Sequence, residues 1–165
     1  MKKIFIFLAA LSASLACAPS TKLFSDSSSR AMDEEASKAQ VQAAESQTLS
    51  FLGNIDSAIA AYYHDRGSIP PDIKSLVPKY LFEIPVVELG LPNYRNTRMV
   101  TVYPPSILKN GRVDGKKIKN TGGWGYVVNG NQVIAFVDAT AALRYPIEPH
   151  APKYWYQQSG ARLTP

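Results

Sequence analysis

Few side chains in this sequence are of the types that perform covalent or metal chemistry. There is one cysteine, Cys17, and there are two histidines, His64 and His150. Because a structural zinc site takes four ligands that are mostly of these two types, a Cys/His zinc cluster cannot be assembled. His64 directly precedes Asp65, but adjacent residues on a helix point in different directions. Motifs for a nucleophilic serine, a phosphate loop or a zinc protease are missing. We therefore expect no catalytic residues, no metal and no cofactor, and identify no small-molecule substrate.

One short segment concentrates positive charge. Residues 109–119 hold five basic side chains, which are Lys109, Arg112, Lys116, Lys117 and Lys119. Such a segment is either a solvated surface loop or a contact for an anionic partner such as lipid head groups, DNA or a polysaccharide. The formal net charge is +5, or +3 without Lys2 and Lys3. This mild charge does not call for nucleic acid, whose binders usually concentrate basic residues on one face.

The N-terminus has the pattern of a secretion signal over residues 1–16. Met1-Lys2-Lys3 is followed by thirteen uncharged, mostly apolar residues, 4–16. This length suits the apolar region of a signal peptide and falls short of the ~20 residues that span a bilayer. The sequence therefore predicts export from the cytoplasm.

Cys17 stands where a lipid would be attached. The run Ser14-Leu15-Ala16-Cys17 resembles the lipobox of bacterial lipoproteins, although that family prefers leucine at the position of Ser14. The alternative is ordinary cleavage after Ala16 or Ala18. We favour acylation of Cys17, which would make the membrane a partner through the lipid. The protein would then lie in the cell envelope, on the outer membrane or the periplasmic face, and otherwise in the periplasm.

The rest of the chain predicts an α+β domain. Residues 17–31 are polar and serine-rich and favour a flexible tether. A helix is expected from about residue 32 to 65, with one apolar stripe: Val41, Thr48, Leu52, Ile55, Ile59 and Tyr62. Residues 97–102, 124–128 and 132–137 are strand-like, and Asn129-Gly130 favours a type I′ hairpin turn between the last two. We expect a long N-terminal helix packed on a small antiparallel sheet, in a domain of residues 32–145.

Three segments resemble type IV pilins and the pseudopilins of type II secretion. Residues 55–70 are similar to the end of the family's long helix, with its Tyr-Tyr pair, Gly turn and proline. Residues 73–85 resemble a "Leu-x-x-Leu-x-Pro-Lys-Tyr-Leu…Ile-Pro" segment, and residues 122–126 a Gly-Trp-Gly-Tyr at the start of the C-terminal hairpin. The resemblance implies a pilin-like fold with these structural residues: Tyr62, Tyr63, Gly67, Pro70, Pro78, Tyr80, Pro85, Trp124, Gly125 and Tyr126.

The chain departs from that family at its N-terminus. The prepilin motif Gly-Phe-Thr-Leu-Ile-Glu and the apolar helix that follows it are missing, and a lipoprotein-like signal stands in their place. We therefore expect an exported, lipid-anchored, non-catalytic accessory or interaction subunit of a secretion or pilus-type machine. The alternative is a free-standing ligand-binding lipoprotein that reuses a pilin-like fold.

Residues 146–165 form a tail rich in proline and aromatic residues. It contains Tyr154-Trp155-Tyr156, which either packs on the domain or forms a contact surface for a partner. We favour packing.

Overall fold

The computed structural model describes residues 22–145 and 152–158. The chain divides into two compact units, Met1–Glu35 and Ala36–Pro165. The first unit contains the N-terminal part of helix α1 (Lys22–Arg66), and the second contains the rest of α1 and all the other described elements. One long helix and a small sheet make the α+β class that the sequence predicts.

The N-terminal bound of α1 differs from the prediction. Residues 22–31 are helical, whereas the sequence favours a tether over 17–31; residues 17–21 lie outside the described residues. Serine and aspartate lower helix propensity by only fractions of a kcal/mol each, and no proline interrupts residues 20–69. At the other end, the helix ends at Arg66. There Gly67 has a φ of +64°, and its N–H donates to the Tyr63 carbonyl at 2.8 Å.

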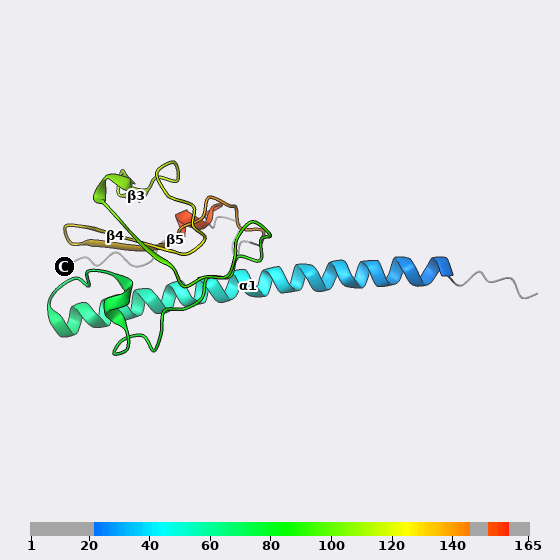
Figure 1. The fold of residues 1–165 in the computed structure, drawn as a ribbon, viewed down its shortest axis with the longest axis horizontal. Coiled ribbons are helices and arrows are strands. Elements are labelled where there is room, and N and C mark those ends of the chain that lie inside the picture. Colours follow the sequence, from blue (N-terminus) through cyan, green and yellow to red (C-terminus); the bar gives the residue numbers. More distant parts are fainter. Residues whose placement is uncertain (1–21, 146–151, 159–165) are drawn as a thin grey trace, which may run out of the picture. The chain divides into compact units, whose positions relative to one another are not determined.

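The main sheet has three strands in the order β1-β4-β5. Figure 1 labels its strands β4 and β5. Strands β4 (Trp124–Asn129) and β5 (Gln132–Val137) pair antiparallel, as predicted. Strand β1 (Val100–Tyr103) pairs with β4 in parallel, so the prediction of an antiparallel sheet is wrong and the sheet is mixed. The chain between β1 and β4 crosses back to the same end of the sheet, as a parallel pair requires. It contains a separate two-stranded ribbon, β2 (Leu108–Lys109) and β3 (Arg112–Val113).

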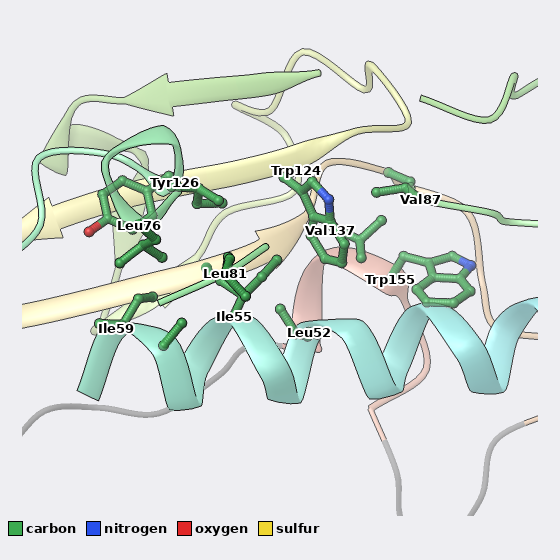
Figure 2. Close-up of a cluster of buried hydrophobic side chains, with 14 of the residues drawn as sticks. Leu52, Ile55, Ile59, Leu76, Leu81, Val87, Trp124, Tyr126, Val137 and Trp155 are labelled. Carbon is green, nitrogen blue, oxygen red and sulfur yellow. The ribbon is translucent and has the colours of Figure 1, made fainter. Parts of the chain in front are cut away.

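Both faces of the sheet are covered. On one face, Trp124, Tyr126 and alternate residues of β5 pack with Leu52, Ile55 and Ile59 of α1 (Figure 2). On the other face, a second cluster contains Tyr103, Ile107, Val127, Ile134 and Phe136, with Leu108, Val113, Ile118 and Tyr156 packed against it. Burial on two sides accounts for the nearly continuous apolar sequence of β5. The basic segment is thereby fixed on the layer opposite α1.

The described residues also form three short 3₁₀ helices: η1 (Ile73–Leu76), η2 (Pro105–Ile107) and η3 (Trp155–Gln157). Helix η1 lies between Pro71 and Pro78, and the Asp72 carboxylate caps it by accepting the Ser75 N–H at 2.8 Å.

The end of the domain lies later than predicted. Trp155 is fully buried in the α1-facing core, and its backbone N–H donates to the Ala141 carbonyl at 3.0 Å. Packing of this aromatic residue is confirmed. Residues 152–158 therefore belong to the domain, and the predicted boundary after Tyr145 is wrong because proline content does not prevent an extended segment from docking.

Candidate functional site

The residues on which the expected resemblance to pilins depends join distant segments inside the core. Trp124 and Tyr126 are fully buried between the sheet and α1 (Figure 2). The Trp124 indole N–H donates to the Pro85 carbonyl at 2.8 Å, and the Tyr126 hydroxyl donates to the Pro70 carbonyl at 2.6 Å. Burial raises the pKa of the Tyr126 hydroxyl. Each aromatic residue thus fills the core and satisfies a backbone carbonyl of the segment that follows α1.

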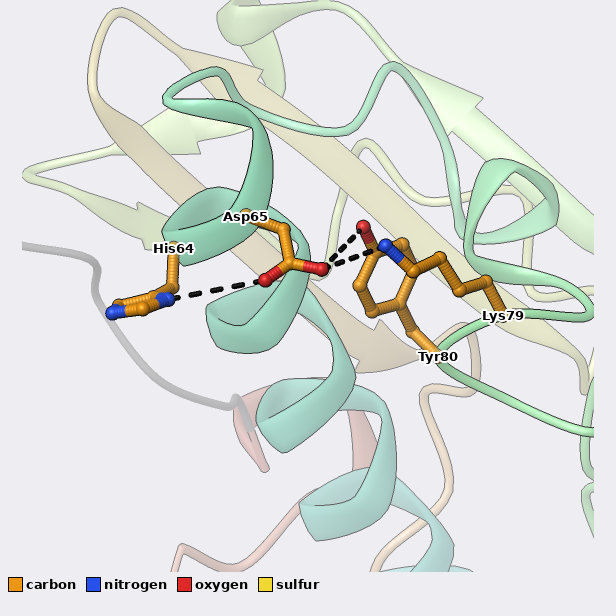
Figure 3. Close-up of polar contacts among 4 residues, drawn as sticks. All are labelled: His64, Asp65, Lys79 and Tyr80. Carbon is orange, nitrogen blue, oxygen red and sulfur yellow. Dashed lines mark hydrogen bonds and ion pairs between the residues drawn. The ribbon is translucent and has the colours of Figure 1, made fainter.

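The end of α1 is tied to the following loop at the surface. The rings of Tyr62 and Tyr80 lie 5.3 Å apart between centroids. The Asp65 carboxylate accepts hydrogen bonds from Lys79 Nζ at 2.8 Å and from the Tyr80 hydroxyl at 3.2 Å (Figure 3). The bonds from Lys79 and Tyr80 hold the pKa of Asp65 below its ordinary value.

His64 belongs to the same surface cluster. Its Nδ1 lies 3.9 Å from the second oxygen of Asp65, and its side chain is 91% exposed. Because the His64–Asp65 pair is exposed to solvent, it lacks the desolvation and the third, orienting group that an acid–base site requires. We interpret the four residues as a clamp between the helix end and the loop.

The basic segment carries a hairpin. Lys109 and Arg112 are directly opposed in the β2–β3 register. The two residues between them, Asn110 and Gly111, have φ of +52° and +72°, the pattern of a type I′ turn. The Gln132 side-chain amide donates to the Gly111 carbonyl at 3.2 Å and ties the turn to β5.

Only two of the five predicted basic residues share one cavity. Lys117 Nζ donates to the Ser106 carbonyl at 2.6 Å, and so is engaged within the protein. The side chains of Lys116 and Lys119 are exposed and do not line the pocket described next. Of the basic residues predicted to contact an anionic partner, only Lys109 and Arg112 therefore lie together at one pocket.

A pocket of about 780 Å³ adjoins the hairpin. Hairpin residues and residues of the C-terminal segment both line it, among them Lys109, Asn110, Arg112, Pro152, Tyr156 and Gln157. Asp114 is its one acidic lining residue. Two smaller pockets, of about 440 and 400 Å³, contain glutamates and a single basic residue, Arg98. The large pocket is thus the cationic one.

A second polar centre serves the fold. Asp138 is fully buried and accepts four hydrogen bonds: from the Tyr103 hydroxyl at 2.8 Å, the Asn120 N–H at 3.0 Å, the Thr121 N–H at 3.3 Å and the Thr121 hydroxyl at 2.6 Å. Burial raises the pKa of Tyr103. All four groups donate to the Asp138 carboxylate, and three of them belong to Asn120 and Thr121. The carboxylate therefore holds the loop before β4 in place.

Sequence reasoning missed two contributions. Nothing in the linear spacing connects the hairpin to residues 152–157, so the cationic pocket could not be foreseen. Glu45 is 1% exposed, and its two carboxylate oxygens accept the N–H groups of Arg144 and Tyr145 at 2.8 and 2.9 Å. The burial of Glu45 could have been inferred from sequence, because Glu45 lies on the predicted stripe between Val41 and Thr48.

Several predictions concern residues outside the described ones. These are the signal of residues 1–16 and the lipid attachment site Cys17. Within residues 22–145 and 152–158, no helix is long and apolar enough to cross a membrane. In the same residues, no three histidine, cysteine, aspartate or glutamate side chains gather to hold a metal ion.

Comparisons with protein-family models, with curated protein sequences and with solved structures found no match to this chain.

Proposed function

We propose that the protein is a non-catalytic, exported, pilin-like subunit of the bacterial cell envelope. It is held on a membrane by a lipid on Cys17 and acts as an accessory or interaction partner of a secretion or pilus-type machine. One observation carries the proposal: the three segments that resemble pilins interlock around a single core. The Tyr62–Tyr80 ring contact and the bonds from Trp124 to Pro85 and Tyr126 to Pro70 link them.

The contacts matter because each motif alone is short. Residues far apart in sequence, such as Pro70 and Tyr126, contact one another: the Tyr126 hydroxyl, which belongs to the motif, donates to the Pro70 backbone carbonyl. A chance similarity of three short motifs would not require them to pack together. The arrangement thus supports a helix-on-sheet domain of the pilin type, whose use as an interaction subunit is inferred by analogy.

The test of this function is co-purification from envelope extracts. The tagged full-length protein is captured after mild cross-linking, in parallel with a Cys17→Ser variant that lacks the anchor. We expect secretion or pilus components with the wild-type protein and their depletion with the variant. Recovery of the same general membrane proteins from an unrelated lipoprotein bait would refute a specific association.

The anchor is tested separately by mass spectrometry of the mature N-terminus. We expect an acylated Cys17, and we expect Cys17→Ser to move the protein into the soluble fraction. A Ser20→Ala variant, changed just beyond the cysteine, is the matched control and should stay with the membrane. A free, unmodified N-terminus at or after Cys17 would contradict the lipid anchor.

The cationic pocket favours a second candidate, a free-standing ligand-binding lipoprotein. Its volume of about 780 Å³ is within the range of small-molecule sites, and its lining combines cations with amide and hydroxyl donors. Under this alternative, co-purification yields a soluble ligand and no machine components.

A further inference from the structure

The tip of the β2–β3 hairpin contains an unfavourable pair of charges. Lys109 and Arg112 are registered opposite each other, and like charges in that position destabilise a ribbon. Both side chains are exposed, and among the described residues neither forms an ion pair with a carboxylate. A local arrangement that costs stability without an evident compensating contact is expected at functional sites.

The pair is held in place by its surroundings. The type I′ turn fixes the two strand ends, and Gln132 bonds to the Gly111 carbonyl. At the base of the hairpin, the Asp114 N–H donates to the Ile107 carbonyl at 3.0 Å, and Leu108 packs on the core of that layer. The two cations therefore cannot separate by splaying the strands, and only their side-chain torsions remain free.

The pocket beside the pair offers donors and no free aromatic face. Tyr156 stacks with Tyr154 at 5.7 Å between centroids and 15° between planes, and its ring also packs closely against Gly115. Its ring is thus occupied within the protein, while Asn110 and Gln157 add side-chain amides to the lining. Recognition here relies on charge and hydrogen bonds, which disfavours ligands that bind chiefly by stacking of a base or a sugar ring.

The balance of charge indicates the class of anion. Asp114 accepts the backbone N–H of Lys116 at 3.1 Å, so one of its carboxylate oxygens is already engaged within the protein. The other charged groups of the lining are the two cations, Lys109 and Arg112. A phosphomonoester carries about −1.5 to −2 near pH 7 and three acceptor oxygens, whereas a carboxylate or a phosphodiester carries a single charge.

We propose that a phosphomonoester group binds in this pocket between Lys109 and Arg112. The Arg112 guanidinium can donate two parallel hydrogen bonds to phosphate oxygens, and Lys109 supplies a second charge from the opposing strand. Asn110, Gln157 and Tyr156 line the remaining space. The site names the ligand class of the pocket that favours the second candidate function, and it is equally compatible with the first.

The test is titration calorimetry and thermal unfolding of the full chain with inorganic phosphate. Arg112→Gln and Lys109→Gln remove one charge each from the pair, and Lys74→Gln removes a charge from an exposed lysine in η1 as the matched control. We expect saturable phosphate binding that either pair variant weakens by about tenfold or more, the loss of a charge-assisted hydrogen bond. Without phosphate, we expect Arg112→Gln to raise the melting temperature, because it removes the cross-strand repulsion.

Vesicles identify the source of the phosphate. Binding to phosphatidylcholine vesicles that contain phosphatidic acid, but not to phosphatidylcholine alone, and loss of that binding in Arg112→Gln would indicate a lipid head group. Binding of inorganic phosphate without vesicle binding would indicate a soluble phosphate ester. The proposal is overturned if phosphate neither binds nor stabilises the wild-type protein, or if Lys74→Gln weakens binding as much as Arg112→Gln.

Discussion

Glu45→Gln tests whether a buried carboxylate fastens the C-terminal part of the domain to α1. Glu45 is 1% exposed on a helix face that is otherwise apolar or neutral. Its two oxygens accept the backbone N–H groups of Arg144 and Tyr145, about a hundred residues away in sequence. Glutamine has nearly the same shape, so the substitution changes hydrogen bonding and charge with little change in packing.

The magnitude follows from the two bonds. A hydrogen bond to a charged group contributes about 1.5–3 kcal/mol net, and a neutral one about 0.5–1.5 kcal/mol. Glutamine keeps one carbonyl oxygen as a neutral acceptor, but it turns an amide –NH₂ toward the other backbone N–H, which is left unpaired. Removal of the buried charge also returns part of its desolvation cost. We therefore expect the free energy of unfolding to fall by about 2–4 kcal/mol, a large share of the 5–15 kcal/mol typical of domains.

Urea unfolding followed by tryptophan fluorescence measures the change, because Trp124 and Trp155 are both fully buried. Glu35→Gln is the matched control, since it is the same substitution at an exposed position of the same helix. Hydrogen exchange adds a local readout, in which the amides of Arg144 and Tyr145 should exchange faster in Glu45→Gln. A loss within about 0.5 kcal/mol of the Glu35→Gln value, with unchanged exchange, would refute the reasoning.

Two further predictions concern the core and the surface clamp. Trp124→Ala should lower the free energy of unfolding by about 3–5 kcal/mol, since a fully buried indole and its bond to Pro85 are lost; an unchanged unfolding curve with loss of partner binding would instead make Trp124 a ligand contact. Carboxyl NMR titration of Asp65 should give a pKa below the ordinary value, mainly because Lys79 and Tyr80 donate to it. The stabilisation from these bonds is then present above the ordinary pKa of aspartate and is lost as the pH falls through the lowered pKa of Asp65. Lys79→Gln should raise the pKa of Asp65 again. An unchanged pKa in that variant would show that the clamp is absent in solution.

The helix and its buried face could be predicted from sequence because they depend on local periodicity. The residues of the predicted stripe are buried or partly buried, and Gly67 ends the helix as a positive-φ residue should. Glu45 was missed because an acidic residue interrupts an apolar pattern, although its position at four residues after Val41 and three before Thr48 continues the spacing. Its partners are backbone N–H groups, which have no sequence signature.

The parallel pairing of β1 with β4 could not be predicted from strand patterns. Val100–Tyr103 and Trp124–Asn129 have the same β-branched and aromatic composition whichever way they run. Strand direction depends on the connection between the strands. The sequence of residues 109–119 is compatible with a surface loop, and the β2–β3 hairpin, which begins at Leu108, has only two residues in each strand. The cationic site was missed for the same reason. Five basic residues in one segment do not indicate which two of them will lie opposite each other once a hairpin forms.

The two Asn-Gly pairs show that the same dipeptide can occupy different positions in a hairpin turn. At Asn110-Gly111 both residues occupy the turn, with positive φ at each, and this opposes Lys109 to Arg112. At Asn129-Gly130 the predicted type I′ turn is wrong by one residue, because Asn129 pairs with Gln132 and the turn consists of Gly130 and Asn131. Only Gly130 has a positive φ there, +58°, as in a type II′ turn.

Hydrophobic alternation cannot distinguish these two registers of β4 and β5. Moving the turn by one residue shifts every cross-strand pair by two, so each side chain keeps its face of the sheet. The choice is made by packing: in the observed register Gly125 is paired with Phe136, and a Cβ at position 125 would overlap the Phe136 ring. Gly125 therefore fits the observed register by leaving room for that ring, whose centroid lies 5.7 Å from that of the Tyr103 ring on the layer that carries the basic hairpin. The cluster that contains Phe136 also packs against Val113 and Tyr156, which line the cationic pocket, so the glycine of the Gly-Trp-Gly-Tyr segment makes room for a ring beneath that pocket's lining.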